Sequence, residues 1–86
     1  MSEQTILDDI IAYIKDKDKS IAVFVKSRKT SRIILLRKKC EGETLEINWV
    51  ITQEELRQIA DSSVFHAIAD AYLDQIKEAV SSHEHH

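Results

Sequence analysis

The chain has a single glycine and no proline among its 86 residues, so it has few means of forming long loops. The glycine, Gly42, lies between two segments, 31–39 and 44–51, that are rich in β-branched and aromatic residues. A two-residue turn at this point predicts a β-hairpin in which Arg37 lies opposite Glu46. A pair of opposite charges across two strands favours this register.

Four further elements are predicted around the hairpin. Isoleucine and leucine recur at helical spacing over residues 5–16, and 20–26 has the composition of a strand. After the hairpin, Thr52 and Glu55 form a capping box that opens a short helix. A longer helix follows, and its apolar residues in line are Phe65, Ile68, Tyr72, Ile76 and Val80. We therefore predict an α+β fold with the order helix, three-stranded antiparallel meander, then two helices (αβββαα), with the helices packed on the sheet.

A chain of this length is expected to form one domain. We place this domain at residues 1–80 and predict a disordered, histidine-containing tail at 81–86. No apolar run approaches the ~18 residues of a membrane-spanning helix, and the N-terminus is acidic where a secretory signal is basic. One cysteine, Cys40, excludes an internal disulfide and fits a reducing compartment. We therefore expect a cytoplasmic protein.

The register of the first hairpin is predicted from its charges. Pairing Lys26 with Arg32 would place like charges opposite each other, which destabilises a strand pair. A shift by one residue places Lys26 opposite Ser31 instead. Val23 then lies opposite Ile34.

These registers assign the strand residues to two faces of the sheet. The face predicted to form the core carries Ile21, Val23, Val25, Ile34, Leu36, Leu45, Ile47, Trp49 and Ile51. The other face carries an apolar cluster of Phe24, Ile33, Leu35 and Val50, with Ala22, rimmed by Lys26, Arg37, Glu46 and Asn48. If all the helices cover the first face, the cluster lies in water, and such clusters mark interaction sites. Alternatively, the first helix crosses to the cluster and buries it within the monomer.

The charges of the chain are strongly segregated. Residues 1–25 have a net charge of −2, residues 26–39 of +7 and residues 40–86 of −8, which together give −3. The basic residues of the central segment are Lys26, Arg28, Lys29, Arg32, Arg37, Lys38 and Lys39. Such a segment suggests contacts with nucleic-acid phosphates. However, six residues of strand separate Arg32 from Lys38 by about 20 Å, so the segment divides into two clusters at opposite ends of the sheet.

The sequence contains no recognisable catalytic set. It lacks a glycine-rich phosphate loop, and no nucleophile, base and orienting group occur in a known pattern. Cys40, near three cations, could be reactive, but it is more simply explained as a spare turn residue, and His66 on the last helix as a surface histidine. His83, His85 and His86 could bind a divalent ion, but no further ligand is fixed near them. We therefore expect no catalytic residue, metal, cofactor or small-molecule substrate.

The order helix, three strands, helix is similar to that of the RNA-binding subunits of the signal-recognition-particle Alu domain, of dimeric secretion chaperones and of some small phage-encoded inhibitors. These families bind both nucleic acid and protein, so the order does not choose between the two. We predict a small non-enzymatic binding or regulatory protein, an inhibitor or adaptor, that engages a protein partner, does not bind membranes and forms a homo-oligomer, a dimer. The predicted partner-binding residues are Phe24, Ile33, Leu35, Val50, Lys26, Arg28, Lys29 and Arg32. The alternative is a small RNA- or DNA-binding protein that uses the basic hairpin 26–39.

Overall fold

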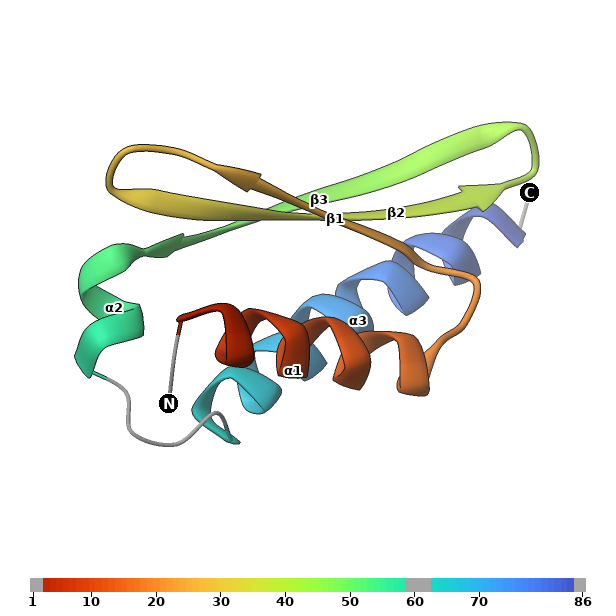
Figure 1. Ribbon diagram of the computed structural model, residues 1–86. Helices are drawn as coiled ribbons and strands as arrows, with labels where there is room; N and C mark the ends of the chain where they lie inside the picture. The colour runs from red at the N-terminus through yellow and green to blue at the C-terminus, as the bar shows by residue number, and fades with distance from the viewer. Residues whose placement is uncertain (1–2, 59–62, 85–86) are drawn as a thin grey trace.

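The computed structural model describes residues 3–58 and 63–84. Their order confirms the predicted αβββαα fold (Figure 1). The elements are α1 (Glu3–Lys17), β1 (Ala22–Ser27), β2 (Ser31–Cys40), β3 (Glu43–Thr52), α2 (Gln53–Gln58) and α3 (Ser63–Glu84). The strands form one antiparallel sheet in the order β1-β2-β3.

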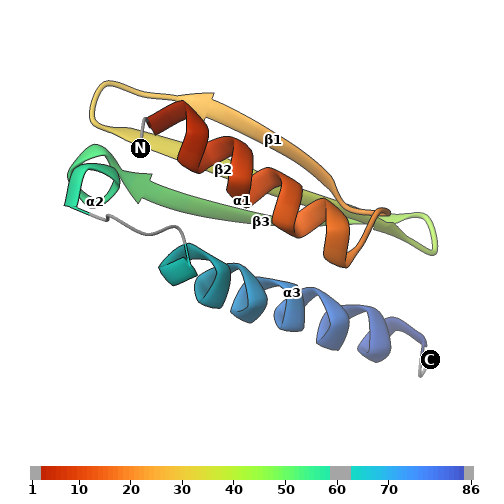
Figure 2. The ribbon, with the colours of Figure 1, turned by 60° about the horizontal axis from the view of Figure 1, so that its bottom comes forward.

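The two long helices lie side by side on one face of the sheet. In Figure 2, α1 runs along the β1 side and α3 along the β3 side, while α2 lies near one end of the sheet. The core between the layers joins Ile10 and Ile14 of α1 to Ile34 of β2 and Phe65 of α3, all essentially inaccessible to water. Burial of this apolar surface is the main force that stabilises a domain of this size.

The β2–β3 hairpin has the predicted register. Glu41 and Gly42 both have positive φ angles, 49° and 83°, as a two-residue type I′ turn requires. Arg37 lies opposite Glu46, and Arg37 Nε is 2.7 Å from Glu46 Oε2. Trp49, opposite Ile34, is buried as predicted.

The predicted register of the β1–β2 hairpin is wrong by two residues. Lys26 lies opposite Ile33 rather than Ser31, and the other pairs shift with it. The shift shortens the connection, because the Arg28 N–H donates to the Ser31 carbonyl oxygen at 2.9 Å. The like charges are still separated, since Arg32 lies opposite Ser27. Because the error is an even number of residues, every side chain keeps its predicted face.

The helix ends agree with the sequence analysis in part. The capping box is confirmed: the Glu55 N–H donates to Thr52 Oγ1 at 3.1 Å, and the Thr52 N–H donates to Glu55 Oε1 at 3.2 Å. Helix α1 begins two residues earlier than predicted. Helix α3 continues past the predicted domain end at residue 80, to Glu84, so 81–84 are helical rather than disordered. The last two residues of the predicted tail, 85–86, lie outside the described residues.

No helix in the described part of the chain combines the length and the apolar character that crossing a membrane would require.

The core assignment predicts the behaviour of Trp49, which is 4% exposed and packs against the rings of Phe65 and Tyr72. Replacing a buried tryptophan by alanine costs about 3–5 kcal/mol, a large share of the stability of a small domain. We expect Trp49→Ala to be mostly unfolded by circular dichroism, and exposed Asn48→Ala to remain folded. The wild type should show blue-shifted tryptophan emission. An emission maximum typical of indole in water would contradict the core assignment.

Candidate interaction surface

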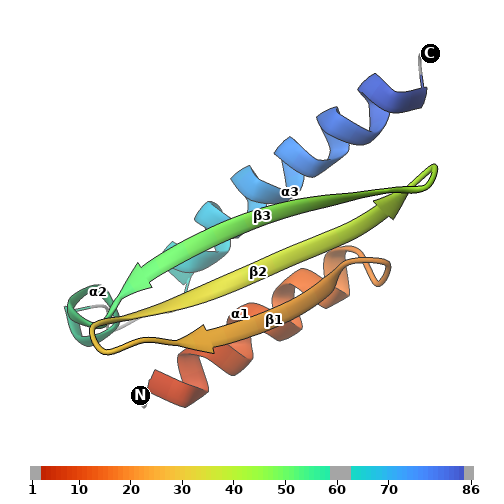
Figure 3. The same ribbon diagram turned by 90° about the horizontal axis from the view of Figure 1, so that it is seen from above.

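One face of the sheet is left uncovered by the described helices. Seen from above in Figure 3, all three strands are in front and α1 and α3 lie behind them. Helix α1 packs on the core face, where Ile6, Ile10 and Ile14 are at most 1% exposed. The alternative in which the first helix crosses to the apolar cluster is therefore excluded. We call the uncovered side the open face.

The apolar cluster lies at the centre of the open face, but its members differ in exposure. Phe24 is 48% exposed and Val50 53%, while Ile33 is half-buried. Leu35 is only 6% exposed, so the expectation that it lies in water is wrong. The reason is its position on the middle strand, where it is flanked by Phe24 and Asn48. Leu35 forms the floor of the cluster, and Phe24 and Val50 are the members that a partner can reach.

Arg37 links the apolar cluster to its charged rim. Its guanidinium carbon lies 5.4 Å from the centroid of the Phe24 ring, a cation–π distance. Its Nε also contacts Glu46, which lies on the same face. Both partners of this ion pair are well exposed, so the pair itself contributes little stability, about 0–1 kcal/mol. Its effect is to hold the guanidinium group over the ring.

A shallow depression of about 500 Å³ adjoins this group at one end of the open face. Phe24, Arg37 and Lys39 line it together with the small residues Ser20, Ala22 and Thr44. An aromatic ring and an arginine beside a hollow are the residue types that anchor protein interfaces. The depression is open to solvent, which fits an extended segment of a partner better than an enclosed small molecule.

The open face is basic although the chain is acidic. Its strand side chains include three cations, Lys26, Arg37 and Lys39, and one anion, Glu46, which gives a net charge of +2. Since the whole chain has a net charge of −3, the rest of it carries −5. The two sides of the molecule therefore differ in sign.

Two residues of the basic segment are directed away from the open face and paired with acids. Arg32, counted among the predicted partner-binding residues, contacts Glu3 of α1 at 2.8 Å and is 18% exposed. Lys38 contacts Asp18 at 2.7 Å, at the other end of α1. Arg32 also donates a hydrogen bond to the Arg28 carbonyl oxygen at 2.9 Å, while the side chains of Lys26, Arg28 and Lys29 remain exposed near the hairpin loop.

The ion pair with Lys38 strongly lowers the pKa of the Asp18 carboxyl group. Lys38 and Ser20 donate hydrogen bonds to the carboxylate and lower the pKa of Asp18 to about 2. A carboxyl group whose pKa is lower in the folded state stabilises the fold above its ordinary pKa. That contribution is lost as the pH falls through about 2. The contact fixes the segment between α1 and β1 to β2.

His66 has a structural role that the sequence did not reveal. Its Nε2 lies 2.7 Å from Asp9 Oδ2, and its ring stacks on Tyr13 with a centroid distance of 4.1 Å. The Tyr13 hydroxyl donates to Asp70 Oδ1 at 2.8 Å, which raises the pKa of Tyr13. These contacts join α1 to α3. The partners are 57 residues apart in the chain, so no local pattern indicates them.

Other candidate chemistry finds little support in the described residues. Cys40 is buried at the end of β2. Within residues 3–58 and 63–84, no group of three or more histidine, cysteine, aspartate or glutamate residues could hold a metal ion. The open face is therefore the strongest candidate site in the described structure.

No family model, curated protein or solved structure matches the chain.

The Asp18–Lys38 pair gives a direct test of the geometry at the end of α1. Replacing Lys38 by alanine removes the main cause of the lowered pKa, so the pKa of Asp18 should rise towards its ordinary value, held down only by Ser20. The measurement is a ¹³C NMR titration of the Asp18 carboxyl carbon. Lys39→Ala, which changes the next cation along the strand, is the control and should leave the titration unchanged. Equal midpoints in Lys38→Ala and wild type would show that the pair does not form.

Proposed function

We propose that this chain is a small non-enzymatic binding protein, a regulator, inhibitor or adaptor, that self-associates and docks an acidic segment of a protein partner on its open face. The observation that carries the proposal is the uncovered sheet face on which Phe24 and Val50 are about half exposed. Exposed apolar residues gathered at the centre of a polar rim are typical of interaction surfaces.

The charges support an acidic partner. The open face carries +2 on a molecule whose remaining surface carries −5. An acidic segment is attracted to this face and repelled by the others, which raises the association rate and fixes the orientation of the complex. Phe24 with Arg37 above it would supply the central anchor, because aromatic and arginine side chains contribute most to binding energy at interfaces.

Nucleic acid is a less suitable occupant. Binding to phosphates requires several cations on one surface. Arg32 and Lys38 are taken up by Glu3 and Asp18 on the helical side of the sheet. The acidic remainder of the chain would repel a long phosphate backbone.

The proposal predicts which substitutions abolish partner binding. The double variant Phe24→Ser, Val50→Ser removes the exposed apolar side chains of the open face and leaves the core intact. The matched control is Val64→Ser, because Val64 is 52% exposed but belongs to α3 and not to the sheet. We expect affinity purification with mass spectrometry to recover the same acidic partner with wild type and Val64→Ser. Recovery with the double variant should fall at least tenfold.

Nuclease treatment separates the two classes of partner. Recovery that survives nuclease and depends on Phe24 and Val50 supports the proposal. Equal recovery by the double variant and Val64→Ser would contradict it. Micromolar binding of RNA or DNA at physiological salt that is lost in Arg28→Glu, Lys29→Glu would instead support the nucleic-acid alternative. Such binding should weaken with salt by a log–log slope near −0.7 for each phosphate contact on a single strand.

A further inference from the structure

Strand β1 forms an edge of the sheet, so half of its residues direct their backbone N–H and C=O groups away from β2. The hydrogen bond that closes the β1–β2 hairpin shows which residues these are. The Arg28 N–H donates to the Ser31 carbonyl oxygen, so the residues of β1 that bond to β2 alternate from there. They are Lys26, Phe24 and Ala22. The N–H and C=O groups of Val23, Val25 and Ser27 therefore point away from the sheet. An edge of this kind is a template for another strand.

The sequence of β1 does little to protect this edge. The run from Ser20 to Val25 contains no charged residue. Four of its last five residues are β-branched or aromatic and apolar. Folded proteins normally place charges, prolines or bulges on exposed edges to prevent pairing. On β3, the opposite edge, Glu43 and Glu46 supply such charges. In β1, Lys26 is the single charged residue.

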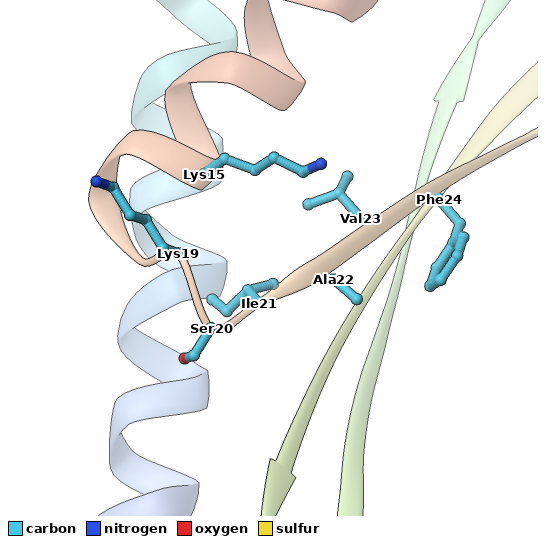
Figure 4. Close-up of a pocket in the computed structure, with 7 residues that line it drawn as sticks. All are labelled: Lys15, Lys19, Ser20, Ile21, Ala22, Val23 and Phe24. Carbon is cyan, nitrogen blue, oxygen red and sulfur yellow. The ribbon is translucent and has the colours of Figure 1, made fainter.

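Helix α1 flanks the same edge and forms a groove with it. Figure 4 shows Lys15 directed towards Val23 of β1, beside a depression of about 440 Å³ that Lys19, on the turn before β1, also lines. Towards the other end, Gln4 and Ile11 face Val25 across a second depression of about 520 Å³. An incoming strand at this edge would therefore also meet the outer side of α1.

The outer side of α1 is complementary in charge to the same side of a second, antiparallel copy of the helix. Gln4, which lines the groove, donates a hydrogen bond to Asp8 at 2.9 Å, so Asp8 lies on the same side near the N-terminal half. Lys15 lies on this side near the C-terminal end. Two copies of α1 arranged antiparallel about a two-fold axis near Ile11 would place each Asp8 close to the partner's Lys15. This arrangement favours a second copy of the chain over an unrelated peptide.

We propose that the chain forms a symmetric dimer in which β1 pairs antiparallel with the partner's β1, centred on Val25. Val25 then lies opposite the partner's Val25, and Val23 opposite the partner's Ser27, which satisfies the free groups with about six main-chain hydrogen bonds. On the open face, Phe24 lies opposite the partner's Lys26, so an aromatic ring and a cation form a cross-strand pair. The two open faces join into one continuous sheet surface.

Proline at position 25 tests the edge directly. Because the Val25 N–H points outward, Val25→Pro removes a donor to the partner strand while the bonds between β1 and β2 remain. Light scattering over a dilution series should give twice the 9.9 kDa of one chain for wild type and for the control Val25→Ala. Val25→Pro should give a single chain with unchanged circular dichroism.

Two further measurements apply even if Val25→Pro does not fold. In the wild type, amide exchange at Val23, Val25 and Ser27 should slow as concentration rises, while the outer edge of β3 is unaffected. Lys15→Glu should raise the dimer dissociation constant by about five- to tenfold, the scale of a few exposed ion pairs. Adding Asp8→Lys to Lys15→Glu restores opposite charges and should restore the dimer.

The outcomes separate this inference from the proposed function on which it builds. A dimer that persists in Val25→Pro, with rapid exchange at Val23 and Val25, would overturn the edge pairing and leave self-association through another surface. A monomeric wild type would overturn self-association as a whole. Neither result alters the docking of an acidic segment, because that depends on Phe24 and Val50 of each open face and is measured by their substitution.

Discussion

The open face exists because α1 packs beside α3 on the opposite face of the sheet. This packing combines apolar burial, through Ile10 and Ile14, with a polar connection between the helices from Tyr13 and His66. If α1 lay on the other side, it would cover Phe24 and Val50, and the core face would keep only α2 and α3. Because both long helices occupy one layer, the second face of a three-stranded sheet is left to solvent or to a partner.

The same packing explains how an acidic chain comes to have a basic face. Acidic residues of α1 and of the segment after it neutralise Arg32 and Lys38, which lie on the core side of β2. The neighbours of Lys38 on β2 point to the opposite face, so Arg37 and Lys39 lie on the open face with Lys26 of β1. The basic segment of the sequence is thus divided by the period of the strand. Two of its seven cations, Arg32 and Lys38, stabilise the contact between helix and sheet, and three others, Lys26, Arg37 and Lys39, lie on the open face.

The sequence predicts the elements and the sheet faces well, because both follow from local patterns. The two-residue turn and the pair Arg37–Glu46 determine the second hairpin. The register of the first hairpin differs from the prediction by two residues because both registers keep Lys26 and Arg32 apart, so the charges alone do not choose between them. The burial of Leu35 does not follow from the pattern of its own strand, since it depends on neighbours across two strands. Contacts between distant segments are what the local pattern cannot supply.

The placement of α1 is most directly tested by nuclear Overhauser effects between side-chain protons. The Tyr13 and His66 rings are stacked at 4.1 Å, so strong cross-peaks should join them. The Phe24 ring should show none to the methyl groups of Ile6 or Ile10. Cross-peaks from Phe24 to these methyl groups, without any between Tyr13 and His66, would place α1 on the open face and contradict the account.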